Sequence, residues 1–191
     1  MSTKNFVVQA AGQGCRGAPR ALQPPVRLGL VADLHGRFDP LLPKVLAGVE
    51  RILVAGDTVD EALLARLGGI APLDAVRGNN DSSPGLRALP EFLVREAAGT
   101  RILVAHDRRD RRLPRELARH RPDVLVVGHS HQPLLRRESG VLVVNPGSAG
   151  PRRFRLPRTA GILLLRRGRP PRVALWDLER DARFPLGLSR D

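Results

Sequence analysis

Short apolar runs bounded by Gly, Pro, Asp or Asn recur along the chain from residue 26 onward. Runs of this length predict β-strands, and three segments between them, 39–47, 60–67 and 113–119, have helical patterns. The predicted strands are 26–32, 52–55, 73–77, 92–96, 102–105, 124–127, 134–137, 141–144, 162–165 and 173–176. Strands alternate with helices in the first two thirds and dominate the last third, which favours an α/β domain whose sheet splits into two layers.

The start of the first helix carries a local signal. Asp39 followed by Pro40 is typical of an N-cap with proline at the first helical position, so we expect Asp39 to cap a helix running to about Ala47. Residues 1–25 are rich in Gly, Pro, Ala and Gln and lack periodicity. They are predicted to be a flexible N-terminal extension.

Length and composition limit the class of protein. A chain of 191 residues favours one domain with a sizeable core. The single cysteine, Cys15, excludes a disulfide scaffold and a metal site built from cysteines. Apolar runs fall short of the ~18 residues of a membrane span, and residues 6–8 are too few for the apolar core of a signal peptide. We therefore expect a cytoplasmic protein with no membrane partner.

Positive charge is concentrated in one stretch. The net charge is +13, and residues 101–172 hold 18 Arg against 5 acidic residues. If these side chains share one face, they would attract anionic substrates or a nucleic-acid backbone. The alternative is a scatter of solvated Arg in a protein encoded by GC-rich codons. Aromatic residues are only 3% and Tyr is absent, which weighs against recognition of single strands by stacking.

Polar clusters follow five of the predicted strands. They are Asp33-Leu34-His35, Gly56-Asp57, Gly78-Asn79-Asn80-Asp81, His106-Asp107 and Gly128-His129-Ser130-His131. Sites in α/β sheets form outside the carboxyl ends of the strands, so the clusters are expected to converge. Mixed imidazole and carboxylate ligands favour Mn, Fe, Co, Ni or Zn. Four His with two Asp and one Asn are too many for one tetrahedral ion and fit two ions sharing a bridging carboxylate.

In this order, the five clusters resemble the motifs of the calcineurin-like metallophosphoesterases. The Val144-Asn145-Pro146-Gly147-Ser148 segment, the following Pro151-Arg152 and the length resemble the small single-domain bacterial phosphodiesterase branch. The resemblance covers about residues 26–176 and implies one phosphoesterase domain over 26–191. The implied fold is a four-layer αββα sandwich, in which two mixed β-sheets are flanked by helices.

The resemblance also implies a ligand set. Asp33, His35 and His131 would hold one divalent ion, Asn79, His106 and His129 would hold a second, and Asp57 would bridge them. Mn²⁺ is the expected ion, with Ni²⁺, Co²⁺, Fe²⁺ or Zn²⁺ as alternatives. The implied reaction is hydrolysis of a phosphodiester in a small or nucleotide-like substrate, with a metal-bound hydroxide as the nucleophile.

Two positions depart from the family pattern. Asn80 stands where phosphomonoesterase branches place a His, so we expect at most a transition-state contact from Asn80 and a preference for diesters. Asp107 replaces the Gly that usually follows the second-metal His. Asp is among the few side chains that tolerate the positive φ that Gly adopts. Asp107 would support a metal ligand or repel a phosphate.

Other residues near the motifs have open roles. Asp81 lies in a family motif without being a ligand there, and we expect it to orient one. Arg108 and Arg109 follow His106 and are candidates for contacts to a substrate phosphate, with a solvated loop as the alternative.

Two other functions stay open at this point. One is a metal-dependent nuclease that binds nucleic acid through the 101–172 face. The other is a non-catalytic scaffold, because a relative with this fold serves as a subunit of a trafficking coat. The resemblance also makes a homodimer possible.

Overall fold

The computed structural model describes residues 24–153 and 155–185. Its first sheet has the strand order β11-β10-β9-β1-β2-β3. The parallel part comprises β1 (Val26–Val31), β2 (Arg51–Ala55) and β3 (Leu73–Val76). The antiparallel part comprises β9 (Thr159–Leu165), β10 (Arg172–Asp177) and β11 (Ala182–Phe184), with β9 beside β1.

The second sheet has the order β4-β5-β6-β8-β7. Its strands are β4 (Phe92–Ala97), β5 (Thr100–Ala105), β6 (Val124–Val126), β7 (Leu134–Glu138) and β8 (Val141–Asn145). The inner strands β5, β6 and β8 are parallel, and antiparallel β4 and β7 form the edges. Ser139 and Gly140 join β7 to β8 with positive φ, as a two-residue hairpin turn requires. The predicted hairpin over 134–144 is therefore present.

Four helices flank the sheets in the described chain: α1 (Leu42–Val45), α2 (Glu61–Gly68), α3 (Pro84–Arg87) and α4 (Leu113–His120). The Asp60 side chain caps α2 by accepting a hydrogen bond from the Ala62 N–H. The prediction that Asp39 caps the first helix is wrong, because α1 begins after Leu41 and has no side-chain cap. Asp39 instead accepts from the Leu41 N–H and pairs with the buried Arg158.

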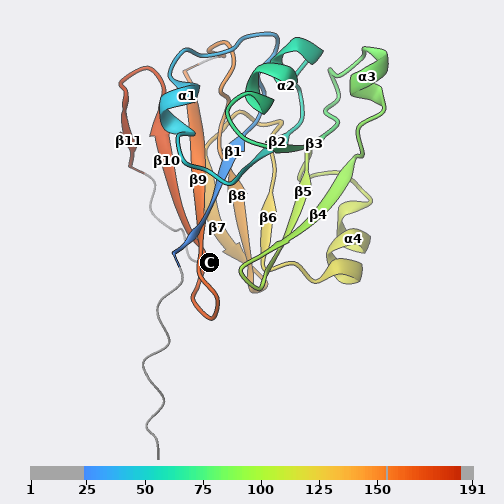
Figure 1. The fold of residues 1–191 in the computed structure, drawn as a ribbon. Helices are drawn as coiled ribbons and strands as arrows, with labels where there is room; N and C mark the ends of the chain where they lie inside the picture. The colour runs from blue at the N-terminus through green and yellow to red at the C-terminus, as the bar shows by residue number, and fades with distance from the viewer. Residues whose placement is uncertain (1–23, 154, 186–191) are drawn as a thin grey trace, which may run out of the picture.

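Residues on alternate faces of the strands build three apolar clusters. The central cluster lies between the sheets, where Leu30 and Leu53 of the first sheet are packed with Val104 of the second. The outer face of the first sheet is covered by α1 and α2, and that of the second by α4. The result is the predicted αββα sandwich of two mixed sheets flanked by helices (Figure 1).

Two short elements were not predicted from the sequence. The single turn α3 is capped by Ser83, and the three-residue β11 gains its order by pairing with β10. Neither is long enough to show a period. The predicted N-terminal extension lies almost wholly outside the described residues. Within the described part of the chain, no helix is long and apolar enough to cross a membrane.

Candidate metal centre

The five polar clusters meet at one end of the sandwich. Parallel strands end at the same edge of a sheet, and the two sheets present these edges side by side. The residues that follow β1, β2, β3, β5 and β6 are thereby brought together, although they are distant in sequence. All seven predicted ligands lie in this group: Asp33, His35, Asp57, Asn79, His106, His129 and His131.

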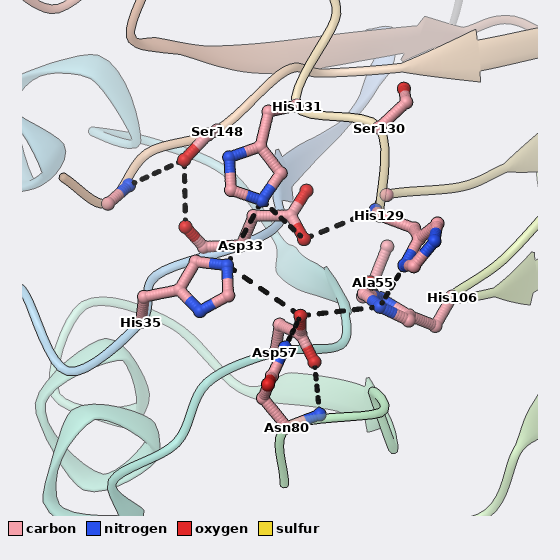
Figure 2. A network of polar contacts seen from close by, with 12 residues as sticks. Asp33, His35, Ala55, Asp57, Asn80, His106, His129, Ser130, His131 and Ser148 are labelled. Atoms are coloured by element: carbon pink, nitrogen blue, oxygen red, sulfur yellow. Dashed lines mark hydrogen bonds and ion pairs between the residues drawn. The ribbon is translucent and has the colours of Figure 1, made fainter. Parts of the chain in front are cut away.

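The closed half of the centre, as we call the group of Asp33, His35 and His131, is buried. The Nε2 atoms of His35 and His131 are 3.0 Å apart, and Asp33 Oδ1 lies 3.7 Å from His131 Nε2 (Figure 2). Asp33 Oδ2 and His131 Nδ1 are buried without a hydrogen-bond partner. Unpaired buried polar atoms are costly, so these two atoms indicate that a further group belongs here.

The open half, as we call the group of Asn79, His106 and His129, reaches the surface. Asn79 Oδ1 lies 2.9 Å from His106 Nε2 and 3.0 Å from His129 Nδ1. The His106 ring is buried and contacts the Ala55 carbonyl through Nδ1, whereas the His129 side chain is 44% exposed. The open half therefore combines one fixed imidazole with one that solvent can reach.

Asp57 lies between the two halves. Its Oδ2 atom is 3.6 Å from His35 Nε2 and 3.5 Å from His106 Nε2. Asn80 donates two hydrogen bonds to this carboxylate, from its backbone N–H to Oδ1 and from its carboxamide to Oδ2 (Figure 2). The side chain of Asn80 is thus bound to Asp57 in this structure.

Burial and neighbouring charges shift several pKa values. Burial raises the pKa of Asp33 to about 7 and lowers that of His131 to about 4, the latter with help from His35. Burial also lowers the pKa of His35. Burial is the largest single influence on Asp57 and His106 and opposes the ionisation of both, but their mutual hydrogen bond and the attraction between their opposite charges act against it. With further hydrogen bonds from Asn80 and to Ala55, the pKa of Asp57 is lowered and that of His106 is raised.

The backbone at the site is held in an uncommon conformation. Non-glycine residues rarely adopt positive φ, and such strain persists only where the surroundings fix it. Five of the seven predicted ligands have positive φ: Asp33, His35, Asp57, His129 and His131. The nearby Gly78 also has no room for a side chain, because a Cβ there would lie 2.2 Å from the Asp57 nitrogen. This close approach explains the glycine of the Gly78-Asn79-Asn80-Asp81 cluster.

Asp81 holds the backbone around Asp57. Its buried carboxylate accepts hydrogen bonds from the N–H groups of Asp57, Val59 and Gly78. Val59 also has positive φ, which is a strained state for a β-branched residue. Asp81 therefore ties together the segments after β2 and β3.

The segment after β8 contributes contacts that sequence reasoning missed. Ser148 Oγ and the Gly150 N–H both donate to the Asp33 carbonyl, and Asn145 Nδ2 donates to the Gly128 carbonyl. Arg158 in turn donates from Nε to the Gly150 carbonyl. The Asn145-Pro146-Gly147-Ser148 turn was visible in the sequence, but only the fold places it against Asp33.

The residues after His106 lie at the rim. Asp107 is not among the residues with positive φ, so this position does not use the conformation that Gly would allow. Its Oδ1 accepts from the Arg109 N–H, and this local turn fixes its backbone. Its Oδ2 lies 3.9 Å from His129 Nε2. Arg108 pairs with Glu138 at 2.7 Å, so a salt bridge already engages its guanidinium.

The donor set fits divalent transition ions. Within the described chain, two groups have ligand atoms within 4.8 Å of one another: Asp33 with His35 and His131, and Asp33 with Asp57 and His106. Imidazole and carboxylate ligands suit Mn, Fe, Co, Ni and Zn. An ion here would also pair the buried Asp33 Oδ2 and favour its ionised form. These residues therefore fit the metal that the motifs imply.

Two stacked mixed sheets with a His and Asp cluster at their carboxyl ends define a metallophosphoesterase-type fold. Residues 26–168 match the calcineurin-like phosphoesterase superfamily domain. The chain belongs to this superfamily. It is 30% identical over 131 residues to a probable metallophosphoesterase of Methanothermobacter thermautotrophicus, an alignment covering 63% of this chain and 76% of the relative.

Solved structures share the fold. Vacuolar protein sorting 29 from Cryptosporidium parvum has a TM-score of 0.71 and 22% identity, covering 85% of this chain and 96% of the other. An archaeal phosphodiesterase has a TM-score of 0.62 and 22% identity, covering 78% of this chain and 99% of the other. At this identity the likeness establishes the fold alone.

Proposed function

We propose that this chain is a phosphodiesterase that uses two divalent metal ions, with Mn²⁺ as the working ion. The observation that carries the proposal is the position of Asp57 between His35 of the closed half and His106 of the open half, at 3.6 and 3.5 Å. A carboxylate with two oxygens at this point suits two adjacent ions. Such a pair can clamp both oxygens of a phosphoryl displacement.

Divalent ions, when bound, polarise phosphoryl oxygens and lower the pKa of water. The side chains of this chain would hold the ions in place. Burial keeps His35 and His131 neutral, as a metal ligand requires, because it lowers the pKa of both rings. The hydrogen bonds from Asn80 fix both oxygens of Asp57 and thus its orientation.

Asn80 supports a diester rather than an alkyl monoester as substrate. A carboxamide cannot protonate a poor leaving group as a general acid, and here it is bound to Asp57. Substrates that do not depend on a protein proton donor are therefore favoured. A phosphodiester with a stabilised leaving alcohol meets that condition.

The test compares two chromogenic substrates. Chelator-treated protein should regain hydrolysis of bis-p-nitrophenyl phosphate with Mn²⁺, and should act more slowly on p-nitrophenyl phosphate. Asp57→Asn should lower the diesterase rate by more than about 100-fold, because it weakens a ligand shared by both halves. Asp181→Asn makes the same change at an exposed carboxylate outside the ligand group and is the matched control. Absence of diesterase activity with every divalent ion would overturn the proposal.

The alternatives have less support. A nuclease would bind a nucleic-acid backbone through free arginines on one face, and at least six of the 18 in the 101–172 stretch pair with carboxylates instead: Arg101, Arg108, Arg112, Arg136, Arg152 and Arg158. Because vacuolar protein sorting proteins share the fold, one of them in complex with Zn²⁺, a non-catalytic scaffold is the other alternative, and the diesterase assay rather than metal content distinguishes it. The cytoplasmic location and the homodimer stay predictions.

A further inference from the structure

A pocket of ≈ 250 Å³ lies beside the open half of the centre. Asn79, His106 and His129 form one wall, so any group bound in this pocket would be next to the metal-ligating atoms. Five charged residues also line the pocket, and Phe92 adds an apolar surface. The charged residues are Arg77, Glu91, Asp107, Asp110 and Arg112.

Carboxylates already bind both arginines of this pocket. Arg112 donates to Asp110 from Nε at 3.0 Å and from Nη2 at 2.7 Å, and to Glu91 from Nη1. Arg77 donates from Nη2 to the other oxygen of Glu91. A guanidinium grips phosphate through a pair of parallel N–H groups, and in Arg112 both edges of the fork are taken. These arginines are therefore poorly placed to bind a second phosphate.

The charge of the pocket also disfavours a second phosphate. Apart from the wall formed by Asn79, His106 and His129, three carboxylates stand against two guanidinium groups among the described residues that line it. Hydrogen bonds from Arg112 lower the pKa of both Glu91 and Asp110, which keeps these carboxylates ionised. Ionised carboxylates only accept hydrogen bonds, whereas hydroxyl and ammonium groups can donate them. A phosphate group would bring further negative charge and acceptor oxygens to the same place.

We propose that this pocket binds one alcohol portion of the diester substrate and selects an uncharged or cationic group that carries hydroxyl or amino donors. An alcohol portion with a further phosphate is disfavoured. The pocket is smaller than the ~300–1,000 Å³ of sites for drug-sized ligands, so the group is compact, such as one nucleoside, sugar or glycerol unit. This inference rests on the proposed function and narrows its substrate class.

The test uses two diesters that differ by one phosphate. These are the p-nitrophenyl ester of thymidine 5′-phosphate and the same ester with an added 3′-phosphate. We expect kcat/KM to be about tenfold higher for the first, mainly through KM, because like charges at close range weaken binding. Calorimetric Kd values for thymidine 5′-phosphate and thymidine 3′,5′-bisphosphate should show the same order, which gives a readout independent of turnover.

Two variants that each lose one carboxylate charge test whether the pocket causes the penalty on the added phosphate. Glu91→Gln removes one carboxylate from the pocket and frees donors of Arg77 and Arg112, so the penalty on the added phosphate should fall at least threefold. Glu96→Gln makes the same change at a side chain that is 64% exposed and does not line the pocket, and it should leave the ratio unchanged. Glu91 is itself partly exposed and lies outside the ligand group, so rates on bis-p-nitrophenyl phosphate report whether Glu91→Gln remains folded and active.

The measured ratios of kcat/KM and of Kd decide whether the inference holds. Equal kcat/KM and equal Kd values for the two members of each pair would overturn the inference, as would equal shifts in Glu91→Gln and Glu96→Gln. If the chain hydrolyses no diester at all, the proposed function fails, and the two calorimetric Kd values alone then judge the pocket.

Discussion

The two halves of the candidate metal centre differ in how far they are open to solvent. In the closed half, the side chains of His35 and His131 are each 8% exposed, whereas His129 in the open half is 44% exposed. The closed half has unpaired buried atoms, and the open half lines a pocket. Under the proposed function, we expect the closed half to hold an ion more tightly and the open half to meet the substrate.

A chain of buried contacts supports the closed half. Arg158 pairs with Asp39 and donates to the Gly150 carbonyl, and the Gly150 N–H donates to the Asp33 carbonyl at 3.1 Å. Such a chain fixes the backbone of a ligand with positive φ. In the open half, Asp107 approaches His129 from the rim. The side chain of Asp107 is 36% exposed, whereas that of Arg158 is 7% exposed.

The largest effect on stability is expected at Arg158. Arg158→Ala leaves the carboxylate of Asp39 buried with the Leu41 N–H as a hydrogen-bond donor but without a cationic partner, which should lower the free energy of unfolding by about 3–5 kcal/mol. Arg180→Ala, at a side chain that is 83% exposed, should change it by less than about 0.5 kcal/mol. Urea unfolding of both variants measures the difference. A loss below about 1 kcal/mol for Arg158→Ala would contradict the role of the ion pair.

Metal binding should stabilise the folded chain. An ion that binds only the native state at a concentration 100-fold above its Kd adds about 2.7 kcal/mol. Adding Mn²⁺ to chelator-treated protein should therefore raise Tm by several degrees. The same titration with Ca²⁺, which prefers oxygen ligands only, should have a smaller effect. An unchanged Tm with Mn²⁺ and with the other candidate transition ions would contradict a metal site at Asp33.

Two matched substitutions test whether the closed half holds metal more tightly than the open half. His131→Ala should lower metal retention after dialysis by about 10–100-fold, because the ion loses a ligand from a buried cage. His129→Ala should retain more metal, since the open half exchanges with solvent in any case. Metal content by elemental analysis provides the comparison. Greater loss of metal in His129→Ala than in His131→Ala would reverse the assigned roles.

The smallest effect is expected at an exposed ion pair outside the ligand group. Lys44 and Asp181 form an exposed ion pair at 2.5 Å, and pairs of this kind contribute about 0.2–1 kcal/mol. Lys44→Ala should shift the urea midpoint only slightly, and high salt should weaken the pair in the parent protein. A loss above about 2 kcal/mol would show that the pair does more than a solvated contact.

The sequence by itself determined the repeated strands and the five polar clusters. Strand length and alternation are local properties, and they were visible at 26–32, 52–55 and 102–105. Each cluster sits directly after a strand, so its place at the edge of a sheet followed from chain order and the rule for parallel strands. The ligand types and the family were therefore predictable from neighbouring residues alone.

Tertiary structure decided what depends on partners distant in sequence. Asp39 has the sequence of a helix cap, but burial against Arg158, 119 residues further on, determines its role. The pairing of Glu91 with Arg112, which sets the charge of the pocket, also joins separate segments. Local patterns specify which face of an element is apolar, whereas these contacts join segments that only the folded chain brings together. The closure of one half of the centre and the openness of the other are therefore products of the fold.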